Sequence, residues 1–217
     1  MPELRFQVEG AERLPHAVSP HLVFRLAIDQ EDAPPAEIDT VLLHVQIRIE
    51  PQLRKYDAPA RKRLFDLFGE PEQWGRTLHG MLWTHADVVV PRFTGRTSVN
   101  LHVPCTFDFN IAATRYFDGL DDGDVPLTLL FSGTIFHRDG TGALRVAPIA
   151  WEREAAFRLP IRAWKDMMES YFPQSAWLRI NKEVFDRLQD FKRRSGTTSW
   201  ENAFDRLLES AEARIAP

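Results

Sequence analysis

The sequence predicts an α+β protein that is mainly β: an antiparallel β-sandwich, immunoglobulin-like or similar, followed by a C-terminal helical segment. Three observations lead to this prediction. Apolar and polar residues alternate in short segments up to Leu159, which is the pattern of half-buried strands. Turn residues separate these segments at modest spacing, as they do in sandwiches. After Pro160, apolar residues recur about every 3.6 positions, which indicates amphipathic helices.

The strand segments follow from this alternation. It is clearest over residues 41–49, where valine, leucine and isoleucine occupy every odd position. The segment 125–137 is apolar on nearly both faces, which is typical of a central strand covered on both sides. The other expected strands are 4–8, 21–29, 81–90, 98–109, 144–151 and 154–159.

Capping residues indicate where the expected helices begin and end. A short helix is expected near residues 58–68, because Asp57 can cap its start and Gly69 can end it. In the C-terminal segment, a first helix starts at Ile161 and ends before Pro173. Two further helices follow, one capped by Asn181 and one introduced by the capping-box sequence of residues 198–201.

These elements predict two parts. Residues 1–160 form a β-sandwich domain that carries the short inserted helix near 58–68. Residues 161–217 form a C-terminal helical appendage packed on the sandwich, because the apolar stripe of such helices must be buried somewhere.

Composition narrows the class of protein. The formal net charge of −4 over 217 residues argues against a nucleic-acid binder, which usually carries a basic excess. No apolar run approaches the ~18 residues that would indicate a membrane span. The first residues begin a strand pattern instead of an apolar signal-peptide core, and a single cysteine, Cys105, fits a reducing compartment. We therefore expect a cytoplasmic protein.

No catalytic signature is present. The chain has no Gly-rich phosphate loop, no G-x-S-x-G, no H-E-x-x-H and no paired C-x-x-C. We expect no catalytic residues, no metal ligands and no cofactor, and we favour a protein that is not an enzyme. His102 and Cys105 are three positions apart on an expected strand, so their side chains point to opposite faces. The parity of Cys105 places it among apolar residues, as a buried structural thiol.

One histidine lies near a carboxylate. Trp83, His85 and Asp87 have the same strand parity and are expected on one face. Such a pair could orient a general base. A polar row facing solvent is the favoured interpretation, because no nucleophile is evident.

The neighbourhood of the inserted helix is the only basic concentration in the chain. A tryptophan in the following GEPEQWG segment would place an aromatic anchor beside a cationic rim, a composition favoured at interface hot spots. Solvation of the helix face is the alternative explanation. The expected partner-binding residues are Arg54, Lys55, Arg61, Lys62, Arg63 and Trp74.

Long segments of the chain resemble one bacterial family. They are HVQIRIEPQLRKY (44–56), RLFDLFGEPEQWGRTL (63–78), MLWTHADVVVPRFTG (81–95), VPCTFDFNIAATRYF (103–117), LLFSGTIF (129–136) and RLPIRAWKDMMESYFPQSAWLRI (158–180). Together they are similar to an uncharacterised family, the domain of unknown function numbered 6084, over nearly the whole chain. The resemblance implies that the gene lies near uptake nickel–iron hydrogenase genes, and hence an accessory or maturation role by association. The family that the chain resembles has no established catalytic residues to assign to positions of this sequence.

The sequence therefore favours a non-enzymatic accessory or protein-binding protein, whose partner is another protein; the resemblance points to a hydrogenase component. Two alternatives stay open. One is a β-sandwich that binds a small ligand or cofactor between sheet and helices. The other is an enzyme whose site a single sequence does not reveal. The oligomeric state is not determined by the sequence.

Overall fold

The computed structural model describes residues 2–32, 34–105, 111–175, 178 and 180–215. The chain forms two compact units, Met1–Ser175 and Ala176–Pro217, which are described separately. Within the described ranges, no helix is both long and apolar enough to span a bilayer.

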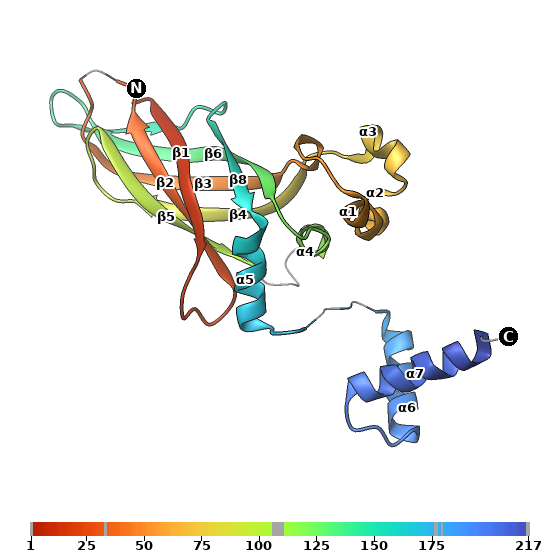
Figure 1. Cartoon of the computed structure of the whole chain (residues 1–217). Helices are drawn as coiled ribbons and strands as arrows, with labels where there is room; N and C mark the ends of the chain where they lie inside the picture. The colour runs from red at the N-terminus through yellow and green to blue at the C-terminus, as the bar shows by residue number, and fades with distance from the viewer. Residues whose placement is uncertain (1, 33, 106–110, 176–177, 179, 216–217) are drawn as a thin grey trace. The chain divides into compact units, whose positions relative to one another are not determined.

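The first unit contains two antiparallel sheets (Figure 1). The three-stranded sheet has the order β1 (Leu4–Arg13), β2 (His21–Gln30), β5 (Arg96–Pro104). The other sheet has the order β4 (Met81–Val90), β3 (Ile38–Ile49), β6 (Asp124–Arg138), β7 (Leu144–Pro148), and β8 (Glu154–Pro160) pairs with the first half of β6. This architecture confirms the predicted fold class, a mainly β α+β sandwich with helices after it.

Aromatic contacts join the two sheets. Phe6 of β1 stacks on Phe131 of β6, with ring centroids 4.2 Å apart. Phe24 of β2 contacts Trp83 of β4 and Phe157 of β8 edge to face, at 6.2 and 5.9 Å. The odd positions of β3 from 41 to 49 are buried, as the alternation predicts. The core therefore lies between the inward faces of the two sheets.

The outer face of β6 is more exposed than the sequence predicts for a strand covered on both sides. Its inward residues are buried, but Ser132 on the outer face is exposed and its neighbours Leu130 and Thr134 are only half-buried. The long apolar run reflects a strand that pairs with β3 on one side and with β7 and β8 on the other. The expected strand 98–109 ends as β5 at Pro104, and residues 106–110 lie outside the described residues.

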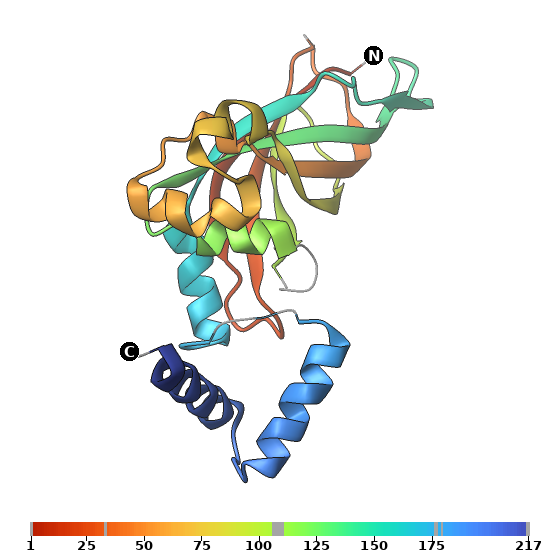
Figure 2. The same cartoon turned by 90° about the vertical axis from the view of Figure 1, so that its right-hand side faces the viewer.

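Helices gather at one end of the sandwich (Figure 1, Figure 2). The segment between β3 and β4 holds the short helices α1 (Ala58–Arg63), α2 (Phe65–Phe68) and α3 (Trp74–Thr77), together with the 3-10 turns η1 (Pro51–Leu53) and η2 (Pro71–Gln73). The helix expected near 58–68 is thus two helices that meet at the buried Leu64. Beside them lies α4 (Ile111–Asp118), which contacts α2.

The first C-terminal helix belongs to the sandwich unit. α5 (Ile161–Tyr171) packs against β1, β2 and β8, and the Tyr171 hydroxyl donates a hydrogen bond to the Ala17 carbonyl at 2.7 Å. Trp164 stacks on Phe117 of α4, with centroids 5.0 Å apart. The boundary between the two compact units therefore follows Ser175, fifteen residues after the change in hydrophobic period at Pro160.

The second unit is a pair of helices, α6 (Lys182–Arg194) and α7 (Trp200–Ile215). The Asn181 side chain accepts a hydrogen bond from the Glu183 amide at 2.9 Å, as expected for a helix cap. At the start of α7, the Ser199 hydroxyl accepts from the Asn202 amide at 3.1 Å, so the capping residue is Ser199 and not Thr198. Packing of the whole segment 161–217 on the sandwich stays a prediction for this second unit.

Candidate functional site: a cationic depression on α1 and α2

The start of α1 is fixed by its cap and by its buried side. The Asp57 carboxylate accepts a hydrogen bond from the Ala60 amide at 2.8 Å. Ala60 and Leu64 are buried, so the other side of the helix carries Arg61, Lys62 and Arg63 into solvent. The spacing of four residues between the two apolar positions sets this orientation.

Arg54 is part of the scaffold. Its two terminal nitrogens donate to the carbonyl oxygens of Asp122 and Asp124 at 2.5 and 2.6 Å. Its Nε is buried and has no hydrogen-bond partner among the described residues. The guanidinium therefore holds the loop before β6, close to Gly123, which adopts a positive φ of 71°. A partner could reach this group only by displacing that loop.

Arg63 has a similar structural role. Its Nε donates to the Gly119 carbonyl at 3.0 Å, and its guanidinium forms an ion pair with Asp121 at 2.6 Å. These bonds connect α1 to the end of α4. Lys55 is exposed, but it does not line the depression described below.

Trp74 lies inside the fold. Its side chain is only 7% exposed, and its Nε1 donates to the Gly69 carbonyl at 2.9 Å. The ring packs edge to face against Tyr56 and Phe68. The predicted aromatic anchor is therefore a core residue that fixes the segment after α2, and it presents no ring to a partner.

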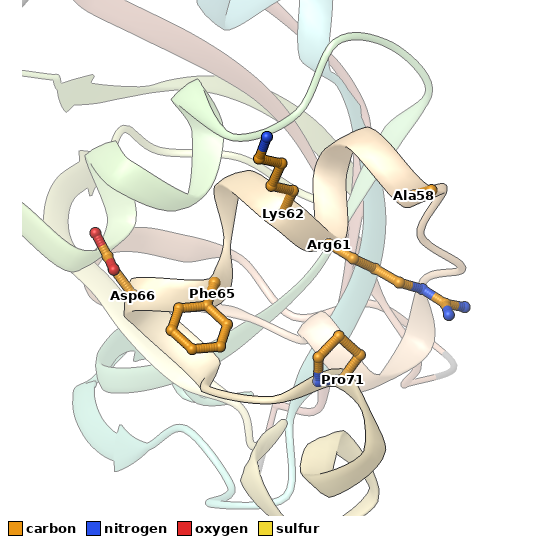
Figure 3. A pocket seen from close by; sticks show the side chains of 6 residues that line it. All are labelled: Ala58, Arg61, Lys62, Phe65, Asp66 and Pro71. Carbon is orange, nitrogen blue, oxygen red and sulfur yellow. The ribbon is translucent and has the colours of Figure 1, made fainter. Parts of the chain in front are cut away.

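A shallow depression opens beside the two cations that the scaffold leaves in solvent. Its volume is about 610 Å³, and it is lined by Ala58, Arg61, Lys62, Phe65, Asp66 and Pro71. In Figure 3 Phe65 and Pro71 lie below α1, whereas Arg61 extends to the right of the helix and Lys62 points upward. The depression combines an apolar wall with a cationic rim.

Phe65 supplies the exposed aromatic group that Trp74 does not. Its side chain is 45% exposed, whereas Leu64 and Phe68 are buried and Leu67 is half-buried. The apolar pattern by itself predicts one stripe that contains Leu64, Phe65 and Phe68. The spacings of four from Leu64 to Phe68 and of three from Phe65 to Phe68 both fit one helix face, so the sequence gives no signal that Phe65 is exposed.

The charges of the lining favour an anion. Neither Arg61 nor Lys62 forms an ion pair with any residue in the described part of the chain, and Asp66 is the single carboxylate of the lining. A carboxylate entering the depression would meet two solvated cations, and an adjoining apolar side chain could pack on Phe65. In protein complexes generally, complementary charge of this kind steers association and disfavours partners of like charge.

The outer face of the larger sheet holds a second polar group. His44 Nδ1 and Asp87 Oδ1 lie 2.6 Å apart across β3 and β4. The register also places Ser132 of β6 beside His44, so a row of Asp, His and Ser crosses three strands. Both members of the pair are more than 60% exposed, and the described contacts include no hydrogen bond from Ser132 to His44. The row is open to solvent, whereas acyl transfer needs a site that excludes water and aims donors at the oxyanion.

The prediction that Trp83, His85 and Asp87 share one face of a strand is wrong. A β-bulge opposite Ile47 and Arg48 inserts Trp83 into β4, so the tryptophan points into the core while His85 and Asp87 remain outside. Asp87 therefore pairs with His44 from the neighbouring strand. Only the strand register brings these two residues together, and the sequence pattern gave no sign of it.

Among the described residues, neither the single cysteine nor the histidines form a reactive thiol or a metal site. Burial raises the pKa of the Cys105 thiol to about 12, so the thiol stays neutral. His102 is exposed on β5 while Cys105 is buried. Within the ranges that the structure covers, no three His, Cys, Asp or Glu side chains converge as metal ligands would.

Comparisons with known proteins place the chain in a family and give only remote structural likenesses. A family model described as a family of unknown function (DUF6084) matches residues 1–216. A comparison with curated proteins found no match.

Among solved structures, the CARDB domain of the PF1109 protein from Pyrococcus furiosus is 9% identical, with a TM-score of 0.28 over 73% of this chain and 87% of that one. A protein from Archaeoglobus fulgidus is 15% identical, with a TM-score of 0.26 over 73% and 97% of the two chains. A β-glucosidase from Kluyveromyces marxianus is 8% identical, with a TM-score of 0.26 over 72% of this chain and 15% of that one. These scores are too low to carry an argument about function.

Proposed function

Since this chain belongs to DUF6084, a family of unknown function, we propose its function from its own surface: it is a non-enzymatic protein-binding protein that docks a partner at the depression on α1 and α2. The observation that carries the proposal is the exposed Phe65 beside two cations, Arg61 and Lys62, that form no ion pair with any residue the structure describes. Arginine and aromatic side chains are enriched where interfaces bind most strongly.

The partner segment should be acidic and carry an apolar side chain. A carboxylate would engage the Arg61 and Lys62 rim, and the apolar group would pack against Phe65 and Pro71. The rigidity of the site supports this role, because Arg54 and Arg63 fix the surrounding segments by hydrogen bonds. A preformed site binds without the entropic cost of ordering its own backbone.

The finer part of the proposal concerns the pathway. The gene neighbourhood implied by the family resemblance supports a cytoplasmic accessory role in nickel–iron hydrogenase assembly or function. A hydrogenase component with an exposed acidic segment is then the partner to look for first.

Photo-crosslinking in the native host tests the proposal while the partner is still unidentified. A photoreactive phenylalanine analogue replaces Phe65 in one strain and Trp151, which is 89% exposed, in a control strain. We expect one protein to crosslink at position 65 and not at position 151. If both positions give the same set of products, the depression is not a specific site.

Purified partner then tests the charge requirement. Arg61→Glu with Lys62→Glu should weaken binding by roughly tenfold or more and flatten its salt dependence, because the attraction of the rim becomes repulsion. Arg13→Glu with Arg158→Glu is the matched control, since both arginines are exposed and lie outside the depression. Equal affinity for the two double variants would remove this surface as the docking site.

A further inference from the structure

The helix pair α6 and α7 leaves most of its apolar side chains partly or fully exposed. Among its described residues, Ala203 is the single buried one, at 2% exposure. The helices have 13 and 16 residues, a length at which an isolated helix is marginal in water. A unit of this size needs a larger core than one buried alanine and a few half-buried side chains provide.

Contacts inside the pair form only part of a core. Trp200 lies against Phe185 of α6 and stacks on Phe204, with centroid distances of 5.5 and 5.9 Å. Lys192 sits over the Trp200 ring and donates to the Thr198 carbonyl at 2.9 Å, which fixes the connection between the helices. Figure 2 shows this connection as a short loop.

An apolar stripe continues on the outside of each helix. On α7, Phe204 and Leu208 are 37% and 60% exposed, and Ala211 extends their line with helical spacing. On α6, Val184 and Phe185 are 43% and 39% exposed. Each helix therefore keeps an apolar surface that its neighbour in the chain covers only in part, because Phe185 and Phe204 also contact Trp200.

The two helices carry opposite charge. α6 has five basic and three acidic residues, a net charge of +2, and α7 has two basic and four acidic residues, a net charge of −2. Arg187 and Arg194 are seven positions apart and flank the stripe of α6; Asp205 and Glu212 have the same spacing beside the stripe of α7. The unit is therefore complementary to a second copy of itself.

We propose that two copies of this chain associate through their helical units, with α6 of each copy packed against α7 of the other. A two-fold axis produces this contact twice, so both stripes are covered and both charge pairs are formed. The product is an assembly of four helices, two from each copy. Pairing of α6 with α6 would instead bring like charges together.

Sedimentation equilibrium of the full chain tests the association. We expect the mass to rise with concentration towards twice the chain mass of 25.0 kDa. Phe204→Glu with Leu208→Glu should give a monomer, and Val18→Glu with Trp151→Glu, at exposed apolar positions of the first unit, should not. A wild-type chain that stays monomeric at every concentration overturns the proposal.

Two charge-reversed chains test the pairing of the helices. Arg187→Glu with Arg194→Glu places acidic groups on α6, and Asp205→Lys with Glu212→Lys places basic groups on α7. Each variant alone should dimerise roughly tenfold or more weakly than wild type. An equimolar mixture should restore the dimer, because the mixed pair again joins opposite charges in both contacts.

Restoration by mixing separates this proposal from a loss of folding, because mixing does not repair a contact within one chain. Circular dichroism of each variant provides a second check on helix content. If mixing restores nothing, or if each variant dimerises as wild type does, the α6-to-α7 pairing is wrong. None of these outcomes depends on the depression at α1 and α2, so the two proposals are tested independently.

Discussion

The hydroxyl groups of Tyr56 and Tyr116 lie 2.7 Å apart. Because the Tyr56 hydroxyl donates to the Pro51 carbonyl at 2.8 Å, the Tyr116 hydroxyl is the donor in the bond between the two rings. Burial raises the pKa of both phenols above the ordinary value, so both remain neutral. The pair connects α4 to the segment that leads into α1.

The direction of this hydrogen bond predicts unequal effects for two similar substitutions. Tyr56→Phe removes the acceptor of the buried Tyr116 hydroxyl and the donor to Pro51, so it should lower the free energy of unfolding by about 1–3 kcal/mol. Tyr116→Phe leaves the bond from Tyr56 to Pro51 in place and should lower it by about 0.5–1.5 kcal/mol. Urea unfolding measures both, and the reverse order would show that the bond runs the other way.

Gly133 should tolerate no side chain. It has a φ of 140°, and a Cβ atom there would lie 2.0 Å from the Leu42 carbonyl oxygen in the neighbouring strand. Gly133→Ala should therefore cost about 3 kcal/mol or more in unfolding free energy, or prevent folding. Gly140→Ala is the control, because no atom lies within 4 Å of its Cβ position, and it should stay within about 0.5 kcal/mol of wild type. Similar unfolding midpoints for the two variants would contradict the close approach of β3 and β6.

Alanine substitutions at Arg61 and at Arg63 should change the free energy of unfolding by different amounts, although the two residues are only two positions apart. Arg63→Ala removes the bond to the Gly119 carbonyl and a partly solvated ion pair with Asp121, at a cost of about 1 kcal/mol. Arg61→Ala touches neither group and should change the free energy of unfolding by less than about 0.5 kcal/mol. Thermal or urea unfolding of the two variants checks this contrast, and equal losses would refute the assignment of Arg63 to the scaffold.

Cys105 should be unreactive in the native protein. It is 7% exposed, and burial raises the pKa of its thiol to about 12. A thiol reagent at neutral pH should label it slowly without denaturant and rapidly in urea. Because the folded pKa exceeds the unfolded value of 9.0, the unfolding free energy should be unaffected below pH 9 and fall as the pH rises towards 12. Fast labelling of the folded chain would contradict the burial.

The turn between β6 and β7 should loosen in acid. Hydrogen bonds from Thr141, the Arg145 guanidinium and the Ala143 amide hold the pKa of the Asp139 carboxyl well below its usual range. A lowered folded pKa stabilises the turn above the unfolded value of 3.8, and this contribution is lost as the pH falls below it. Asp139→Asn should reproduce the loosening at neutral pH.

Hydrogen exchange of the Thr141 and Ala143 amides measures this effect. The Gly95 amide is the internal control, because it donates to the neutral Gln30 side chain at 2.6 Å, which does not titrate. If all three amides respond equally to acid, Asp139 does not control the turn.

Local patterns in the sequence determined the sandwich and most of its elements. The odd positions of β3 face the core because side chains of a strand alternate between two faces, and one of those faces is buried. The same parity predicted the burial of Cys105, and Asn181 marked the start of α6 because a cap bonds to amides two or three residues away. Each of these features depends on residues close together in the chain.

Contacts between residues far apart in the chain decided the site. His44 meets Asp87 through strand register, and a single inserted residue in β4 turns Trp83 into the core. Arg63 is structural because α4 brings Gly119 and Asp121 to it, whereas the adjacent Lys62 faces solvent. Their charges look alike in the sequence. Only the tertiary structure shows which of them the fold has already used, because a side chain's partners depend on the packing of distant segments.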